Sequence, residues 1–380
     1  VGPDLAPFFT DDDGAATALA SAGARVRDPV WRLPFWPGYE SMIEPGIADL
    51  DNAPGGGFAG AITAALFLRR FVENPAYIHF DIYGHQPGDA PARPKGGAAG
   101  ADDAGVLTVD RREILANSRV AHSALRGQID APEFADLTGA EIAVPLADLL
   151  SAPGGTRDRQ LLLGDRFEVL ERHEGFAFGR AVKDGYCGYL RETGLCACTQ
   201  VSHWVAAPGS HLYSEASVQA AETRWVSFGS RVRVLGQSGS FAETPHGFIP
   251  SCHLQRLGSW YSEPVEVAGL FLGVPYLWGG NSLAGLDCSG LVQAALLACG
   301  QACPGDSDQQ QALGADIPPE AALQRGDLLF WKGHVAMMVD ADVLIHANGH
   351  FMATVIEPAQ DAIARIAAGS GGDVIARRRF

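Results

Sequence analysis

An internal repeat of short strand-like segments constrains the fold of this chain more than any other feature of its sequence. Residues 163–170 match residues 228–235 at an offset of 65 positions. Each copy has glycine turns between segments in which apolar and polar residues alternate, as in Leu163-Gly164-Asp165-Arg166. This pattern is typical of small antiparallel β-barrels. The sequence therefore predicts two small barrels, one after the other along the chain.

The two copies resemble bacterial SH3-like domains. Modules of that family often accompany enzymes that act on peptidoglycan. The resemblance leaves two roles open for them. They could contact a ligand themselves, or they could act as spacers that shape the site of a neighbouring domain.

A reactive cysteine is predicted at the start of a helix in residues 274–303. A loop rich in glycine runs into Asp287-Cys288-Ser289-Gly290, and apolar residues then recur at helical spacing from Leu291 to Cys299. The free backbone N–H groups and the positive dipole end at a helix start stabilise a thiolate, which is the nucleophilic form of cysteine. The alternative is that Cys288 is a small buried apolar residue.

Two histidines follow on predicted strands and complete a possible catalytic set. Residues 323–331, 333–340 and 343–350 are three apolar, strand-like segments. His334 and His346 are expected near the ends of these strands, facing one cleft. A cysteine hydrolase needs a base that holds and returns the thiol proton, and a third polar group that orients the base. We therefore expect Cys288 as nucleophile, His334 as base and His346 as the orienting group.

This combination resembles the NlpC-type peptidases, which are papain-like cysteine peptidases acting on cell-wall peptides. The resemblance rests on Tyr276-x-Trp278-Gly-Gly, Asp287-Cys288-Ser-Gly-Leu-Val, Arg325-Gly-Asp-Leu and Gly333-His334-Val, and it covers residues 263–380. It implies a papain-like α+β domain without a cofactor. It also implies a substrate bond, the amide between γ-linked D-Glu and an L-diamino acid in peptidoglycan stem peptides.

Substrate contacts follow from the same resemblance. The hydroxyl of Tyr276 could donate a hydrogen bond to the oxyanion, beside the backbone N–H of Cys288. Ser289 is a further candidate contact. Asp287 is either a substrate contact or the N-cap of the helix, and the cap is slightly favoured.

A second group of contacts implies that the substrate is a short, free peptide. Asp306 and Ser307 resemble a segment that, in members with SH3-like domains, binds the free amino group of L-Ala. The alternative is that this segment is a capped loop. In such members the first SH3-like domain closes one end of the cleft, and Tyr186 or Tyr189 would form that wall here. The resemblance then implies L-Ala-γ-D-Glu-diaminopimelate as substrate and a role in murein recycling.

The N-terminal part resembles a different family. Residues 31–36, 47–52, 55–68 and 78–83 are similar to the C-terminal end of the catalytic domain of leucyl aminopeptidases. That family holds two metal ions with an Asn-Thr-Asp-Ala-Glu-Gly-Arg motif, which this sequence lacks. We therefore expect an α/β fragment without metal ligands, formed by helices at 15–22 and 60–72 and a strand at 77–83.

The predicted fold class is a multidomain α+β protein with four parts. These are an aminopeptidase-like fragment with a linker (1–104), a helical lead-in and first SH3-like barrel (105–199), a second barrel (200–258) and the peptidase domain (259–380). Residues 85–104 have the Pro- and Gly-rich composition of a linker. Residues 111–126 are predicted to form a helix.

Charge and cysteine usage narrow the possible partners. The formal net charge of −16 argues against nucleic acid or an anionic membrane as the main partner. No export signal or run of about 18 apolar residues is visible, which predicts a cytoplasmic protein. The seven cysteines cannot all pair, and Cys196-x-Cys198 lacks a partner pair at zinc spacing, so we expect reduced thiols and no metal.

Two other function classes remain open at this point. One is a non-catalytic cell-wall-binding protein in which the SH3-like modules bind and the peptidase domain is inactive. The other is a related Cys/His amidase or acyltransferase. The complete set of Cys288, His334 and His346 favours a peptidase over the first.

Overall fold

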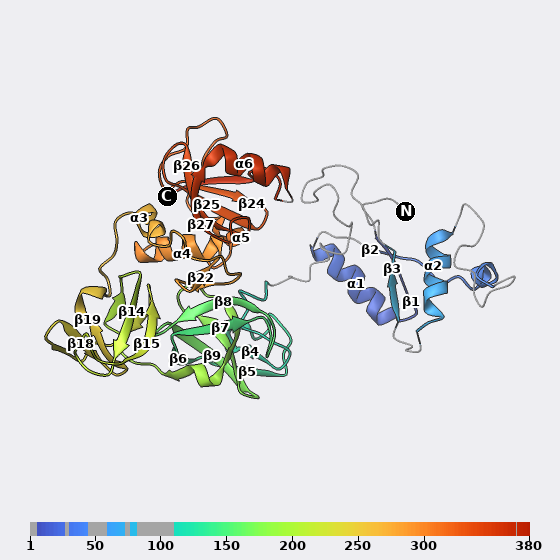
Figure 1. The fold of residues 1–380 in the computed structure, drawn as a ribbon. Coiled ribbons are helices and arrows are strands. Elements are labelled where there is room, and N and C mark those ends of the chain that lie inside the picture. The colour runs from blue at the N-terminus through green and yellow to red at the C-terminus, as the bar shows by residue number, and fades with distance from the viewer. Residues whose placement is uncertain (1–5, 27–29, 45–58, 73–76, 82–109, 370) are drawn as a thin grey trace. The chain divides into compact units, whose positions relative to one another are not determined.

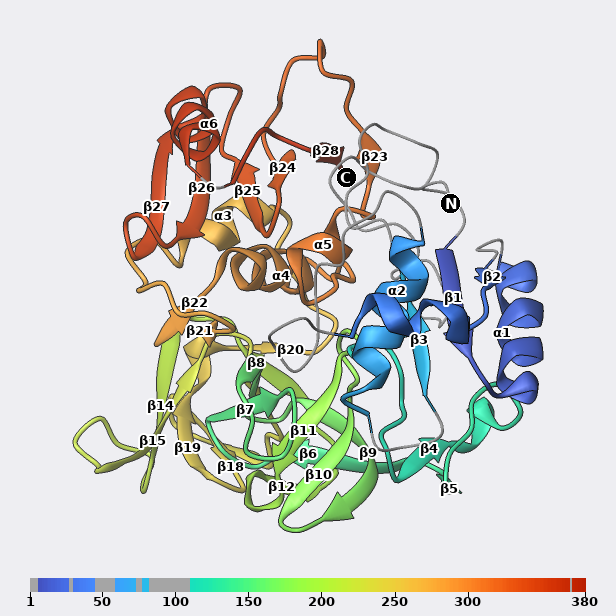
Figure 2. The same ribbon diagram turned by 90° about the vertical axis from the view of Figure 1, so that its right-hand side faces the viewer.

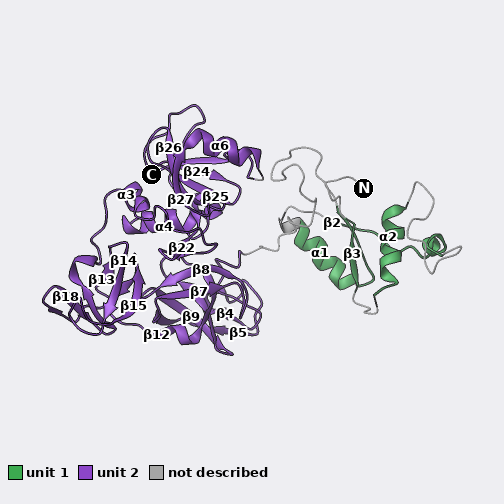
Figure 3. Cartoon of the chain, viewed as in Figure 1, with its two compact units in different colours: residues 1–109 green, residues 110–380 purple. Residues whose placement is uncertain are grey.

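The computed structural model describes residues 6–26, 30–44, 59–72, 77–81, 110–369 and 371–380. The chain forms two compact units, residues 1–109 and 110–380 (Figure 3). The predicted linker at 85–104 lies outside the described residues.

The first unit is a small α/β layer. Strand β1 pairs in parallel with β2 and antiparallel with β3, and Figure 1 shows this sheet between α1 and α2. Phe9, Phe35, Ile43 and Leu66 form its buried core. The two predicted helices and the strand are present, and the elements of this unit are β1 (Ala6–Thr10), α1 (Asp13–Val26), β2 (Val30–Arg32), η1 (Pro37–Met42), α2 (Gly60–Arg69) and β3 (Ile78–Phe80).

The helix predicted at 111–126 is wrong. The segment forms a turn, the short strand β4 (Val120–His122) and the 3-10 turn η2 (Ser123–Leu125). The side-chain oxygen of Asn117 accepts hydrogen bonds from the backbone N–H groups of Arg119 and Val120. Because these donors are taken by a side chain, the helical hydrogen-bond ladder cannot pass through them.

The regular secondary structure of residues 133–256 is almost entirely β-strand. In the first part seven strands hydrogen-bond in the order β12-β6-β9-β10-β11-β7-β8, and β5 pairs with β4. Ile142, Leu149, Leu161, Phe167 and Leu190 face its core. The strands are β5 (Glu133–Ala135), β6 (Thr138–Ile142), β7 (Leu146–Leu150), β8 (Arg157–Leu162), β9 (Arg166–His173), β10 (Phe176–Ala181), β11 (Cys187–Arg191) and β12 (Leu195–Ala197).

The second part forms a five-stranded and a three-stranded sheet, in the orders β15-β14-β19-β18-β17 and β16-β13-β20. The repeated glycines Gly164 and Gly229 both occupy turns at positive φ, which glycine adopts at no steric cost. The strands are β13 (His203–Val205), β14 (Gly209–Tyr213), β15 (Glu222–Ser227), β16 (Arg231–Val232), β17 (Gly236–Ser238), β18 (Phe241–Thr244), β19 (Gly247–Pro250) and β20 (Leu254–Arg256).

The C-terminal part is built on a six-stranded sheet in the order β23-β28-β24-β25-β26-β27. Its helices are α3 (Pro264–Gly269), α4 (Cys288–Ala298), the short α5 (Ser307–Gln310) and α6 (Ala359–Ala368). Its strands are β21 (Asn281–Ser282), β22 (Gly285–Leu286), β23 (Ala315–Asp316), β24 (Leu328–Trp331), β25 (His334–Met338), β26 (Val343–Asn348), β27 (Ala353–Pro358) and β28 (Ala376–Arg379).

Side chains of the central strands alternate between two buried faces of this sheet. Val335 and Met337 face the core that contains α4. Ala336 and Met338 face the opposite core, which α6 covers. Because both faces are covered, β24, β25 and β26 are almost entirely apolar, in agreement with the predicted strands.

Helix α4 occupies the centre of the second unit. Figures 1 and 2 both show it between the β24–β27 sheet and the β-rich part of the chain. Its first residue, Cys288, lines a cleft together with residues of both parts, among them Asp158 and Tyr186 of the β-rich part. The predicted multidomain α+β fold class is confirmed.

Candidate active site

Cys288 is the first residue of α4, as the sequence predicts. Asp287 is the N-cap, and its side chain accepts hydrogen bonds from the backbone N–H of Gly290 at 2.7 Å and from Ser289 Oγ at 3.0 Å. Its other oxygen accepts a bond from the backbone N–H of Gly279 at 2.9 Å. Both carboxylate oxygens of Asp287 are thus used to hold the loop and the helix start together, which favours the cap over a substrate contact.

The Cys288 thiol is buried, and this burial decides its acidity. Burial and the nearby Asp287 raise the pKa of Cys288 to about 12. The backbone N–H groups of Val335, Ser289 and Cys288 itself face the sulfur and act in the opposite direction, but they do not outweigh burial. The expected thiolate at the helix start is therefore not the resting form. A base must take the proton as the sulfur reacts.

His334 and His346 form a hydrogen-bonded pair on the neighbouring strands β25 and β26. His334 begins β25 directly before Val335, whose N–H faces the sulfur. His334 Nε2 lies 2.8 Å from His346 Nδ1, and the Trp331 ring packs against His334 with the ring centroids 5.6 Å apart. Burial, with His346 and Arg365 nearby, lowers the pKa of His334 to about 3. Burial and Arg365 lower the pKa of His346 to about 4.

These two lowered pKa values predict a pH-dependent stability. Both histidines are neutral when folded but take up protons near pH 6.5 when unfolded. The stability is therefore fully present above pH 6.5 and is lost as the pH falls toward the folded pKa values. We expect the free energy of unfolding, measured by urea titration, to fall by at most about 1.4 kcal/mol per pH unit and histidine between pH 6.5 and 4.5.

The control for this prediction separates His334 from the other titrating groups. His334→Gln is expected to flatten the slope, whereas His173→Gln, at an exposed position in β9, is expected to leave it unchanged. An identical slope in the wild type and His334→Gln would contradict the prediction.

Two charged residues that the sequence did not single out complete the line of contacts behind His346. Glu357 in β27 has one carboxylate oxygen 2.7 Å from His346 Nε2. Arg365 in α6 donates a hydrogen bond to the same oxygen of Glu357 and lies over the Phe351 ring. In the sequence, Glu357 and Arg365 are simply charged residues near the C-terminus. Charged residues at such positions usually face solvent, so the sequence gives no sign of a buried contact.

Strand β8 of the β-rich part contacts the loop that precedes Cys288. Arg157 donates two hydrogen bonds to the carbonyl of Trp278, at 3.1 and 3.0 Å. The backbone N–H of Gln160 donates to the side chain of Asn281. At Gly279, where φ is +68°, an added Cβ would lie 2.4 Å from the carbonyl oxygen of Asp158. The glycine therefore permits the close approach of β8.

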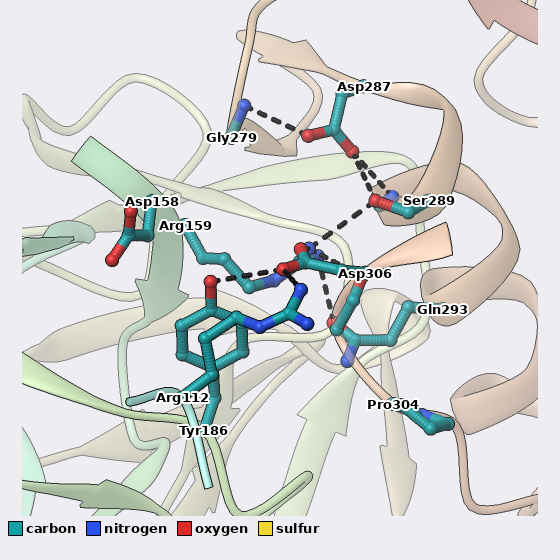
Figure 4. A network of polar contacts seen from close by, with 12 residues as sticks. Arg112, Asp158, Arg159, Tyr186, Gly279, Asp287, Ser289, Gln293, Pro304 and Asp306 are labelled. Carbon is teal, nitrogen blue, oxygen red and sulfur yellow. Dashed lines mark hydrogen bonds and ion pairs between the residues drawn. The ribbon is translucent and has the colours of Figure 1, made fainter. Parts of the chain in front are cut away.

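Arg159 joins the same strand to the segment with the predicted amine site. Its side chain is 1% exposed, donates to Asp306 at 2.9 Å and also contacts the Gly305 carbonyl. Arg112 donates to the other Asp306 oxygen at 2.6 Å, and the Tyr186 hydroxyl donates to it at 3.1 Å. Figure 4 shows these groups converging on Asp306. The carboxylate is thus already held by two guanidinium groups.

The resulting cleft has a volume of about 450 Å³. It contains the predicted residues Tyr276, Cys288, Ser289 and Ser307, and burial raises the pKa of Tyr276, so its hydroxyl keeps its proton. Five of its residues come from the β-rich part or its lead-in. The lining residues are Asp110, Arg111, Arg112, Asp158, Tyr186, Tyr276, Trp278, Asp287, Cys288, Ser289, Asp306, Ser307, Asp308 and Gly333.

Tyr189 does not line this cleft, unlike Tyr186. It lies within β11, opposite Phe178 on β10, and the two ring centroids are 4.8 Å apart. The ring packs against a separate apolar cluster that includes Leu115 and Val120. Its position inside the strand directs it to that cluster, whereas Tyr186 precedes the strand. The prediction of Tyr189 as a cleft residue is therefore wrong.

In the described part of the chain, no three His, Cys, Asp or Glu side chains gather closely enough to hold a metal ion. No helix there has the length and apolar character needed to cross a membrane.

Comparison with known proteins identifies the parts of the chain. Residues 273–362 match the NlpC/P60 family, residues 149–195 match the bacterial dipeptidyl-peptidase SH3 domain, and residues 1–108 match the catalytic domain of the cytosol aminopeptidase family. The second unit thus contains an NlpC/P60 domain, of a family of cysteine peptidases and amidases, together with a bacterial SH3 domain. The predicted resemblances to NlpC-type peptidases and to leucyl aminopeptidases are confirmed, and the resemblance to bacterial SH3-like domains is confirmed for the first of the two copies.

Individual relatives agree with this division. A solved NlpC/P60 family protein from Bacillus cereus shares 22% identity with a TM-score of 0.54, covering 64% of this chain and 99% of that one. This likeness shows a shared fold. Probable cytosol aminopeptidases of Chloroherpeton thalassium and Caulobacter vibrioides are 38% and 45% identical over 28% and 22% of this chain. The chain spans only 20% and 16% of the length of these two curated relatives.

Proposed function

We propose that this chain is a cysteine endopeptidase that hydrolyses the amide between γ-linked D-Glu and an L-diamino acid in peptidoglycan stem peptides. The arrangement around Cys288 carries the proposal. Its buried thiol faces the N–H of Val335, and the preceding residue, His334, is hydrogen-bonded to His346. Nucleophile, base and orienting group are the three parts that a cysteine hydrolase needs.

The proposed reaction has two stages. The Cys288 sulfur attacks the γ-carbonyl carbon while its proton passes to His334. His334 then gives this proton to the leaving amine, the C–N bond breaks, and a thioester remains on Cys288. His334 next takes a proton from water as the water oxygen attacks the thioester carbon. The C–S bond then breaks, the proton returns from His334 to the Cys288 sulfur, and the γ-carboxyl product leaves and ionises. The backbone N–H of Cys288 and the Tyr276 hydroxyl are the proposed oxyanion donors.

The charge of the cleft supports a substrate with a free amino terminus. The carboxylates of Asp110, Asp158, Asp306 and Asp308 outnumber the guanidinium groups of Arg111, Arg112 and Arg159 that pair with them. This negative excess favours an ammonium group. Because Arg112 and Arg159 already hold Asp306, the amine would be bound by the whole cluster and not by Asp306 alone. A free L-Ala-γ-D-Glu-diaminopimelate peptide, as arises in murein recycling, fits this description.

N-acetylation of this tripeptide is expected to lower kcat/KM by about 100-fold. The acetyl group removes the positive charge and leaves the carboxylate cluster without its partner. The measurement is product formation followed by mass spectrometry, with the free and acetylated peptides compared at the same concentrations.

Two outcomes would count against parts of the proposal. Equal cleavage of the free and the acetylated peptide would show that the carboxylates of Asp110, Asp158, Asp306 and Asp308 do not bind the amino group of the substrate. If the protein does not cleave the free peptide but its Cys288 still reacts with iodoacetamide, the proposed substrate is wrong. The assignment of Cys288 as a reactive thiol would still hold.

A further inference from the structure

The hydrogen bonds behind His334 have a direction that is set at their far end. Glu357 is ion-paired with Arg365, and one of its carboxylate oxygens lies 2.7 Å from His346 Nε2. An ionised carboxylate can only accept a hydrogen bond. His346 is therefore protonated on Nε2, where it donates to Glu357.

This protonation state determines the next contact. A neutral imidazole that carries its proton on Nε2 has a lone pair on Nδ1. His346 Nδ1 must then accept the 2.8 Å hydrogen bond from His334 Nε2. His334 in turn has its lone pair on Nδ1, the ring nitrogen nearer the backbone. The backbone N–H of the following residue, Val335, is close to the Cys288 sulfur.

We propose that Glu357 is a positioning residue, which acts through His346 to keep His334 in the tautomer that can accept the proton of Cys288. This inference rests on the proposed function, because it assigns Glu357 a role in the same active site. Glu357 is 11% exposed and His346 is fully buried, so water does not replace the contact readily. The carboxylate also lies where it stabilises the positive charge that His334 gains during attack.

Other charged groups lie near this line of contacts and influence the transfer of the Cys288 proton to His334. Arg365 on α6 opposes protonation of both histidines, and Asp287 opposes ionisation of the thiol. Glu357 lies between Arg365 and His346, so it separates the guanidinium charge from the imidazole. Loss of the Glu357 carboxylate is therefore expected to lower the reactivity of Cys288 in two ways. The tautomer of His334 is no longer fixed, and the positive charge of Arg365 is no longer separated from His346.

The test uses Glu357→Gln in the full chain, with alkylation of Cys288 by iodoacetamide as the readout. A glutamine amide can donate to His346 Nε2, which reverses both hydrogen bonds and places a proton on His334 Nδ1. We expect the alkylation rate at pH 7 to fall about ten- to hundredfold. Without a base, the rate should rise by roughly tenfold per pH unit from pH 6 to 9 as the thiol ionises, whereas the wild type stays nearly flat.

Two control variants separate positioning from a loss of structure. Asp361→Asn removes an exposed carboxylate from α6, the helix that also carries Arg365, and is expected to change the rate less than twofold. In a His346→Asn background, Glu357→Gln is expected to add less than a twofold effect, because the residue it acts through is gone. A full effect in that background would overturn the proposal.

A measurement on the unaltered protein keeps the proposal testable if the variant does not fold. The ¹⁵N chemical shifts of the histidine side chains are expected to show His334 and His346 both protonated on Nε2. Protonation of His334 on Nδ1 would overturn the proposal, as would an unchanged alkylation rate in folded Glu357→Gln. Neither readout uses a peptide substrate, so failure of the proposed substrate would leave this result unaffected.

Discussion

Replacing Cys288 by alanine is expected to lower the rate of cleavage of L-Ala-γ-D-Glu-diaminopimelate by about 10⁴-fold or more. The substitution removes the sulfur that forms the thioester, and the neighbouring Ser289 hydroxyl donates its proton to Asp287 and is a much weaker nucleophile than a thiol. The change in side-chain volume is small, so the fold is retained. The measurement is the initial rate of release of diaminopimelate, followed by mass spectrometry.

Cys252→Ala is the matched control, because it removes an exposed thiol from η4 (Ser251–His253), outside the cleft. Its rate is expected to equal that of the wild type. Cleavage by Cys288→Ala at more than about a hundredth of the wild-type rate would contradict the assignment of the nucleophile. A second enzyme in the preparation would be recognised by equal residual rates in Cys288→Ala and His334→Ala.

Replacing Arg159 by methionine is expected to lower the free energy of unfolding by about 3 kcal/mol. The methionine fills the space of the arginine stem but leaves Asp306 with one guanidinium partner where it had two. The Gly305 carbonyl and the Gln293 amide also lose a donor in a buried position. Urea unfolding of the full chain, followed by tryptophan fluorescence, measures the change.

Two comparisons test the reason for this loss. Arg172→Met removes a partly exposed ion pair with Glu192 and is expected to cost less than about 1 kcal/mol. Adding Asp306→Asn to Arg159→Met is expected to restore part of the stability, because it removes a carboxylate that has lost one of its two guanidinium partners. Equal losses for Arg159→Met and Arg172→Met would show that Arg159 does not join the two parts of the unit.

The start of α4 could be predicted because its signals are all local. Asp287, the N-cap, lies next to Cys288, and the apolar residues that mark the helix follow within three turns. The strands that carry His334 and His346 were predictable for the same reason, since short apolar runs between turns are typical of buried strands.

The helix predicted at 111–126 shows where local patterns fail. Ile114, Leu115 and Val120 have helical spacing, but the Asn117 side chain captures the backbone donors that a helix needs. Arg112 is held in the cleft by Asp306 and Asp308, more than 190 positions away. Ion pairs at such separations leave no periodic signal in a sequence.

Glu357 and Arg159, which act through the residues that they contact, could likewise not be predicted from the sequence. Glu357 and Arg159 are ordinary charged residues within a strand, and nothing beside them in the sequence indicates a buried partner. Their roles arise because β27 lies next to β26 and because β8 meets the loop before Cys288. Each contact depends on how separate elements pack, which side-chain periodicity does not describe.

The sequence by itself determined the resemblance to an aminopeptidase segment, an SH3-like module and an NlpC-type cysteine peptidase domain, and it predicted Cys288, His334 and His346 as a catalytic set. These follow from turns, caps and apolar spacing, which act over a few residues. Only the tertiary structure decided the state of the Cys288 thiol, the paired state of Asp306 and the contact of Glu357 with His346. Burial and ion pairing control those properties, and both exist only once distant segments have packed together.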